Sequence, residues 1–179
     1  MNFDNRSGVG DNQTHVKDIS IYANNGTCYT EALVLGVKFV NNCNYSTGKY
    51  GYGIKFNGAN ETIQVLDDND LDITSSFTIM AWINISQLPA SGDIDGIIGK
   101  GLNETPRDNY NYLFSLSRQA STNNKLSLSF SASTSDIQDI NYTFDHTLGQ
   151  LYHVAGVFDD SANTLTLYQD GIQVAQRTG

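Results

Sequence analysis

Carboxylates are the side chains of this sequence that could carry out bond-breaking chemistry. Retaining cleavage of a glycosidic bond needs two carboxyl groups about 5 Å apart, most naturally alternating along one strand. The glutamates are Glu31, Glu61 and Glu104, which are far apart and fall in predicted loops or at strand starts. Neighbouring aspartates fall in predicted turns. Neither a Ser-His-Asp order nor a phosphate loop nor a zinc-ligand spacing is present, so the sequence predicts no enzyme.

Four consecutive polar side chains suit a different task, which is binding without reaction. Arg107, Asp108, Asn109 and Tyr110 lie in a predicted loop over residues 101–111. Guanidinium, carboxylate, amide and phenol groups can together donate and accept hydrogen bonds with sugar hydroxyls. Polar loops often have this composition without binding anything. We take these four residues as the candidate ligand site, with an ordinary solvated loop as the alternative.

Residues 51–85 are the stretch that must position such loops. Short runs rich in Ile, Phe, Thr and Val are separated by Asn-Gly and Asp-Asn-Asp, which is typical of antiparallel strands joined by tight turns. In the run 77–85, apolar residues alternate with Thr78, Met80, Trp82 and Asn84, so one face is wholly apolar and the other partly so. We expect a central strand whose second face is also largely covered. Asp170-Gly171 predicts a hairpin near the end of the chain.

Four motifs in order make the sequence similar to a known family, the laminin-G-like domains of the concanavalin A-like lectin/glucanase fold. The motifs are Phe56-Asn57-Gly58, the run 71–83 containing Ala81-Trp82-Ile83, the run 97–101, and the run 151–159 followed by 164–171. The resemblance spans residues 3–179. It implies an all-β, antiparallel two-sheet sandwich of the jelly-roll type, with residues 1–179 as one domain.

The resemblance also implies a function, a non-catalytic carbohydrate-binding or adhesion module. The alternative is a structural subunit or spacer of a surface assembly. A structural calcium is often held near the early loop in relatives, which makes Asp18 a candidate metal ligand or else a turn cap. His153 is expected to be a packing residue, as its counterparts are. Family members usually continue past the last hairpin, so we expect missing closing strands and self-association through an open sheet edge, unless the domain closes early.

Composition limits the partners. A net charge of −9, with only ten Lys and Arg residues in 179, argues against nucleic acid and anionic lipid. The acidity fits either cation binding or plain solubility. The sequence has no apolar stretch long enough to cross a bilayer and begins without a recognisable signal peptide. We expect the chain to be part of a longer surface protein, with glycans or surface glycoproteins as partners.

Two kinds of residue point outside the cytoplasm. Cys28 and Cys43 lie in a polar region without a core of its own, where a disulfide is favoured over two buried thiols. Eight Asn-x-Ser/Thr sequons occur, although 19 asparagines and 31 serines and threonines in 179 residues would give about three by chance. The expected glycosylation sites are Asn5, Asn12, Asn25, Asn44, Asn60, Asn103 and Asn141. The eighth, Asn84, shares a strand face with Trp82 and is expected to be buried.

Overall fold

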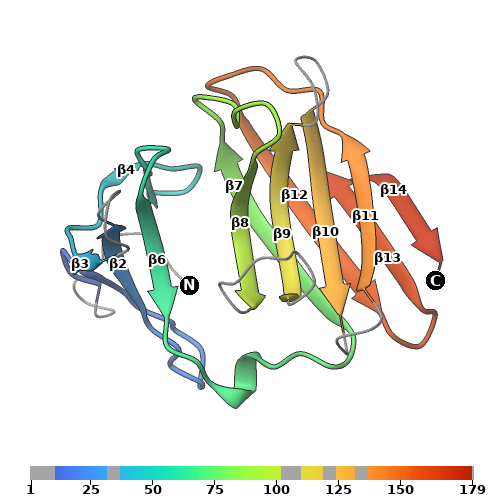
Figure 1. The fold of residues 1–179 in the computed structure, drawn as a ribbon, viewed down its shortest axis with the longest axis horizontal. Helices are drawn as coiled ribbons and strands as arrows, with labels where there is room; N and C mark the ends of the chain where they lie inside the picture. The colour runs from blue at the N-terminus through green and yellow to red at the C-terminus, as the bar shows by residue number, and fades with distance from the viewer. Residues whose placement is uncertain (1–10, 32–36, 102–109, 119–123, 132–136, 179) are drawn as a thin grey trace. The chain divides into compact units, whose positions relative to one another are not determined.

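A computed structural model of the protein describes residues 11–31, 37–101, 110–118, 124–131 and 137–178 (Figure 1). Antiparallel strands dominate these ranges, in which the one helical segment is the 3-10 turn η2 (Asn69–Leu71). No helix in the same ranges is long and apolar enough to span a membrane. The chain divides into two compact units, Met1–Asp70 and Leu71–Gly179. The all-β prediction is confirmed, whereas one domain over 1–179 stays a prediction.

The N-terminal unit is built around β2 (Gly26–Glu31). This strand pairs with β1 (His15–Val16), β3 (Lys38–Val40) and β6 (Glu61–Val65), while β4 (Tyr45–Thr47) and β5 (Tyr52–Ile54) form a separate hairpin. The unit has a small core, in which Val16, Cys28 and Cys43 are buried. Because so few apolar side chains meet there, the disulfide is a major part of what holds the unit together.

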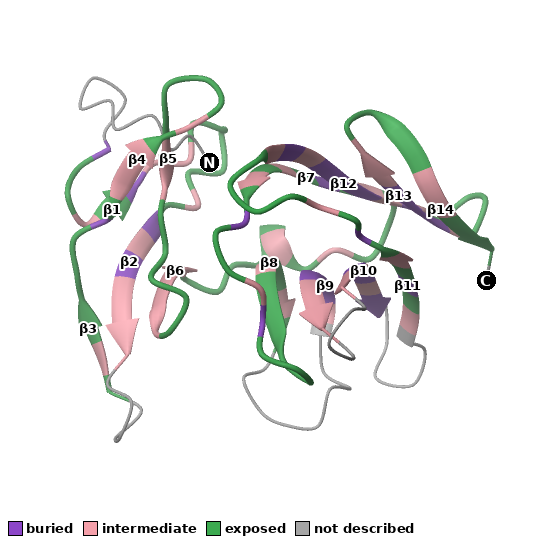
Figure 2. Cartoon of the chain, turned by 90° about the horizontal axis from the view of Figure 1, so that it is seen from above, coloured by how far each residue is buried: buried purple, intermediate pink, exposed green. Residues whose placement is uncertain are grey.

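The C-terminal unit is a two-layer sandwich. One sheet has the order β14-β13-β12-β7, formed by β7 (Phe77–Asn84), β12 (Leu151–Asp159), β13 (Thr164–Gln169) and β14 (Ile172–Thr178). The other has the order β11-β10-β9-β8, formed by β8 (Ile94–Gly101), β9 (Tyr110–Arg118), β10 (Asn124–Ser131) and β11 (Ile137–Thr143). Figures 1 and 2 show the two sheets stacked face to face. The predicted antiparallel two-sheet sandwich is confirmed.

Alternation along the strands creates the core between these sheets. In β10 the apolar residues Leu126, Leu128 and Phe130 are buried, and the serines between them face outward. From the other sheet, Phe158 meets Phe130 with ring centroids 4.4 Å apart. A Cβ added at Gly156 would lie 2.9 Å from Cδ2 of Leu128. Side chains of the two layers therefore interlock closely, and a glycine is required where they approach most tightly.

The described residues bear on two predictions about β7. β7 was expected in the middle of its sheet; among the described strands it pairs with β12, and a central position stays a prediction. Its outer face is open rather than covered, with Met80 59% and Trp82 39% exposed.

Candidate functional site

The outer face of the β7-β12-β13-β14 sheet carries a group of large side chains, of which two are exposed and two are half-buried. On the core side, Ile79, Val154 and Leu167 are buried between the layers. Because neighbours in a strand point to opposite faces, Met80, Trp82, His153 and Tyr168 project outward. We call these four residues the outer strip. They come from three adjacent strands, since β12 pairs with both β7 and β13.

Two rows of cross-strand partners make up the outer strip. Trp82 lies directly opposite His153, with ring centroids 5.2 Å apart and planes inclined by 59°. In the neighbouring row, Met80 and Tyr168 flank Ala155, which is 7% exposed. The small alanine leaves the row low at its centre, with a larger side chain on each side. The strip is thus a shallow, partly apolar surface rather than a deep pocket.

Hydrogen-bonding groups border the outer strip on its β13 and β14 side. Tyr168 pairs with Gln173, and Thr166 pairs with Gln176, whose Nε2 donates to the threonine Oγ1 at 3.3 Å. Amides and hydroxyls both donate and accept, and aromatic faces pack against apolar surface while leaving polar edges accessible. A ligand with apolar faces and many hydroxyls, such as a sugar, fits both properties.

The predicted hairpin turn holds His153 in place. Asp170 has a φ of 51° and is followed by Gly171 with a φ of 81°, which confirms the turn signal of the sequence. The Asp170 carboxylate accepts from the His153 backbone N–H at 2.9 Å, and the Asp170 N–H donates to the His153 carbonyl at 2.7 Å. Turn residues distant in sequence therefore fix the strand segment that carries the outer strip.

The predicted polar loop lies mostly outside the described residues. This applies to Arg107, Asp108 and Asn109, whereas Tyr110 begins β9. Asn111, expected in the loop, is a strand residue whose amide bonds the N–H and carbonyl of Ile73 at 2.9 and 2.7 Å. Its side chain is therefore structural. The four-residue ligand site stays a prediction.

The outer strip was missed at the sequence level. Trp82 and Met80 alternate with the core residues of β7, and that pattern was taken to mean a covered second face. His153 was interpreted as packing, and it does pack, but against an exposed tryptophan. The sequence did contain a signal for this site. Trp82 and His153 both occupy the alternate positions of their strands that point away from the core.

The described glutamates do not form an acid pair. Glu61 of β6 pairs with Thr30 of β2, so those two side chains share one face of the sheet. Glu31 is the next residue along β2 and faces the opposite side. Glu104 lies outside the described residues. The two glutamates that the fold brings onto neighbouring strands are therefore separated by the sheet itself.

Asp93 and Asp95 are a closer pair of carboxylates than the sequence predicted. They precede and enter β8 two residues apart, where a turn was expected. Partial burial, and then the negative charge of Asp93, raise the pKa of Asp95.

Asp18 forms a closed turn. Its carboxylate accepts from the Ser20 N–H at 2.9 Å, the Ser20 hydroxyl at 2.7 Å and the Asn24 N–H at 2.9 Å. Burial raises the pKa of Asp18, but these hydrogen bonds outweigh it and hold the pKa below its usual value. Within the described ranges, no group of three or more His, Cys, Asp or Glu residues could hold a metal ion. The described surroundings of Asp18 suit a turn cap, and calcium binding there stays a prediction.

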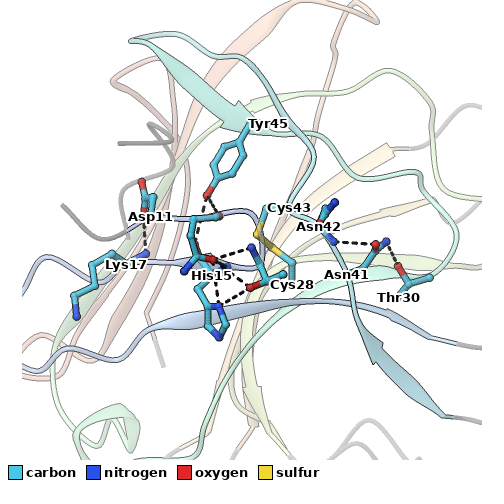
Figure 3. Close-up of a disulfide and its surroundings, with 11 residues drawn as sticks. Asp11, His15, Lys17, Cys28, Thr30, Asn41, Asn42, Cys43 and Tyr45 are labelled. Atoms are coloured by element: carbon cyan, nitrogen blue, oxygen red, sulfur yellow. Dashed lines mark hydrogen bonds between the residues drawn. A yellow bond between two sulfur atoms is a disulfide. The ribbon is translucent and has the colours of Figure 1, made fainter. Parts of the chain in front are cut away.

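The predicted disulfide is confirmed. Cys28 and Cys43 are bridged, with Cα atoms 5.4 Å apart (Figure 3). Backbone hydrogen bonds surround the bridge: the Cys28 N–H donates to Thr14 at 2.9 Å, and its carbonyl accepts from Asn41 at 3.0 Å. The hollow beside it, lined in part by Asn42 and Lys55, has a volume of about 10 Å³, which suffices for a water molecule and not for a sugar.

The predicted glycosylation sites differ in their surroundings. Asn12, Asn25, Asn44 and Asn141 are exposed, and Asn5 and Asn103 lie outside the described residues. Asn60 is half-buried, and its side-chain N–H donates to the Glu31 carbonyl. Asn84 is exposed, although burial was expected, and its amide donates to the Gly149 carbonyl at 2.9 Å. Attachment of glycans stays a prediction.

The antiparallel two-layer sandwich of the C-terminal unit defines the fold class. The model of the concanavalin A-like lectin/glucanases superfamily matches residues 57–179. The chain therefore belongs to this superfamily, whose members include both sugar-binding proteins and glycosidases. The match begins between β5 and β6 of the N-terminal unit and continues through every strand of the C-terminal unit.

A solved structure with a TM-score above 0.5 agrees on the fold. Domain 4 of AbnA, a GH43 extracellular arabinanase from Geobacillus stearothermophilus solved with arabinotriose, is 17% identical with a TM-score of 0.58, over 93% of this chain and 75% of that one. A native heptameric SAP-like pentraxin from Limulus polyphemus is 18% identical with a TM-score of 0.42. That alignment covers 59% of this chain and spans 44% of the pentraxin chain. No curated protein matches the sequence.

Proposed function

We propose that this chain is a non-catalytic carbohydrate-binding or adhesion module that works outside the cell. The outer strip is the observation that carries the proposal: an exposed Trp82, paired with His153 and flanked by Met80, on an open sheet face. A pyranose or furanose ring would lie its C–H face on the indole. Its hydroxyls would bond the polar border formed by Gln173 and Gln176.

The location outside the cell rests on separate support. Cys28 and Cys43 form a disulfide, and structural disulfides persist mainly in oxidising compartments. The excess of sequons agrees with export, and Asn141 is exposed on β11, where a glycan would not disturb the core. Glycans or surface glycoproteins are the proposed partners. Calcium is not required by this mode of binding, because aromatic stacking and amide hydrogen bonds supply the contacts.

A direct test is binding of the purified chain to an immobilised panel of glycans. Arabino-oligosaccharides belong in the panel because the arabinanase domain was solved with arabinotriose. We expect saturable binding that Trp82→Ala reduces at least about tenfold, since stacking and burial of an aromatic ring contribute about 1–3 kcal/mol. Leu66→Ala is the matched control, because it also removes an exposed large apolar side chain, in the N-terminal unit.

Two other functions would give different results in the same assay. A structural spacer would bind no glycan on the panel. A hydrolase would release reducing ends from a bound glycan, and Asp95→Asn would abolish that release because Asp95 is the described carboxylate with the raised pKa. We expect binding without release of reducing ends in both the wild type and the Asp95→Asn variant.

A further inference from the structure

We propose that Asn84 carries an N-linked glycan, and that this glycan covers the outer strip and keeps it from binding other sugars. Asn84, Ile85 and Ser86 form a sequon without proline. The effect on binding rests on the proposed function, which makes the outer strip a sugar-binding surface. Attachment of the glycan and its cover over Trp82 do not rest on it.

Expected burial was the reason for leaving Asn84 out of the glycosylation sites, and the structure removes that reason. Asn84 is exposed and is the last residue of β7. Ser86 is also exposed, in the segment between β7 and β8. Asparagines that carry glycans lie at the surface, because the attached oligosaccharide is bulky and hydrated. The position of this sequon therefore suits attachment.

The amide of Asn84 can take up a sugar without losing its hydrogen bond. Its Nδ2 donates to the Gly149 carbonyl at 2.9 Å, and a primary amide nitrogen has two hydrogens. Transfer from a lipid-linked oligosaccharide diphosphate forms a bond between Nδ2 and C1 of the first sugar. The bond from C1 to the diphosphate oxygen breaks, and Nδ2 gives up one proton. The remaining N–H can still donate to Gly149, so the linkage stays anchored close to the start of β12.

Strand geometry places this glycan beside Trp82. Side chains two residues apart on a strand share a face, and their Cα atoms lie about 7 Å apart. Asn84 and Trp82 therefore both project outward. Their partners on β12, Leu151 and His153, share that face. A branched oligosaccharide is larger than this spacing. Whatever else the indole contacts, its exposed 39% lies within reach of the first sugars.

A glycan attached next to a sugar-binding surface competes with free glycans. Because it is tethered, its effective concentration at the outer strip is high, on the order of millimolar for a short flexible link. A free glycan must displace the attached one before its own C–H face can lie on the Trp82 indole. Occupancy at Asn84 thus sets whether the outer strip is available, and the chain without this glycan is the binding form.

Asn141 provides a matched comparison within the same unit. It is an exposed sequon residue on β11, in the other sheet of the sandwich. The preceding residue, Ile140, is 6% exposed and belongs to the core, so Asn141 projects from the outer face of that other sheet. A glycan at Asn141 lies on the far side of the sandwich from the outer strip and should leave it uncovered.

Secretion of the full chain from eukaryotic cells, followed by peptide mass spectrometry, tests attachment. We expect a glycan at Asn84 in the wild type and in Ser86→Thr, which keeps the sequon. Ser86→Ala removes the sequon but leaves Asn84 and its bond to Gly149 in place, so the glycan should be lost. An unoccupied Asn84 in the secreted wild type overturns the proposal.

Fluorescence quenching by acrylamide tests the cover without any ligand. Trp82 is the only tryptophan of the chain, so its emission reports on the outer strip. We expect the quenching constant of the secreted wild type to be at least about twofold lower than that of Ser86→Ala, because a bulky glycan covers the exposed part of the ring. Asn141→Gln, which loses a glycan from the other sheet, should be quenched like the wild type. Equal constants for the wild type and Ser86→Ala overturn the cover.

Binding of the secreted chains to the glycan panel separates this inference from the proposed function. We expect Ser86→Ala to bind at least about tenfold more tightly than the wild type, which is the difference that stacking on one aromatic ring accounts for. Equal binding of the two would overturn the competition and leave the proposed function standing. No binding by Ser86→Ala would contradict the proposed function and with it the effect on binding. The quenching constants would still decide whether the glycan covers Trp82.

Discussion

Trp82 and His153 face each other directly across β7 and β12, with ring centroids 5.2 Å apart on the outer face of the sheet. Neither residue belongs to the core. Each is positioned by contacts of its own strand as well as by the contact between the two rings. Two hydrogen bonds fix the strand at His153: the Asp170 carboxylate accepts from the His153 N–H, and the Asp170 N–H donates to the His153 carbonyl. The core residues of β7 fix the strand at Trp82. A binding surface that is rigid before its ligand arrives loses less entropy on binding.

The clamp at His153 leads to the first prediction. Asp170→Ala removes the acceptor for the His153 N–H and places a residue with less tolerance for a φ of 51° in the turn. We expect a loss of about 1–2 kcal/mol in the free energy of unfolding, measured by urea denaturation. Asp170→Asn keeps both an acceptor oxygen and the turn preference. A similar loss in both variants would contradict the assigned role of the side chain.

Close packing between the sheets leads to the second prediction. A Cβ at Gly156 would lie 2.9 Å from Leu128 Cδ2, and Leu128 is fully buried. We expect Gly156→Ala to destabilise the fold by about 1–3 kcal/mol through overpacking. At Gly96 the nearest atom would be Leu113 Cδ1 at 3.8 Å, so Gly96→Ala should cost much less. Adding Leu128→Val should relieve the Gly156→Ala defect, and purely additive effects in this double-mutant cycle would refute the contact.

Strand type and core membership could be predicted from the sequence, whereas the neighbours of each strand could not. The alternation in β10 gave both the strand and its buried face correctly, because Leu126, Leu128 and Phe130 repeat with period two. The same reasoning failed for the second face of β7, which was expected to be covered. A partly apolar second face fits a covered strand, and it equally fits a strand whose outer face carries exposed Trp82 and Met80.

The candidate site was harder to predict because it is assembled from distant parts of the chain. Trp82 and His153 are about 70 residues apart in sequence and meet only through strand pairing. A contiguous polar run such as Arg107–Tyr110 is easier to notice than a pair set by sheet register. Local signals worked where the physics is local: the Asp170-Gly171 turn and the cysteine pair were both predicted correctly.

The disulfide leads to the third prediction. The bridge closes a loop with a sequence separation of 15, and the chain-entropy model assigns such a loop about 3 kcal/mol. We expect reduction, or the double change Cys28→Ala and Cys43→Ala, to open the N-terminal unit while the sandwich of the C-terminal unit persists. Hydrogen exchange measured by mass spectrometry would locate the loss of protection. Reductant should have no further effect on the double variant, and unfolding of β7–β14 upon reduction would contradict this account.

The turn at Asp18 leads to the fourth prediction. Burial raises the pKa of Asp18, yet hydrogen bonds from Ser20 and Asn24 prevail and lower it overall. A carboxylate with a lower pKa in the folded state stabilises the fold above the pKa of the unfolded state. That stability is lost as the pH falls through the folded pKa. We expect the wild type to lose more stability than Asp18→Asn between about pH 5 and pH 2. Parallel stability profiles over that range would refute the role of the carboxylate.

A nuclear magnetic resonance titration of the chain with its best-binding glycan tests the central claim most directly. The account predicts that the largest shifts fall on the Trp82 indole N–H, the Met80 methyl group and the His153 ring, with smaller shifts at Gln173 and Gln176. It also predicts that Trp82→Ala abolishes them. Shifts centred on residues 102–109 or in the N-terminal unit, or binding that survives Trp82→Ala unchanged, would contradict the outer strip as the carbohydrate-binding site.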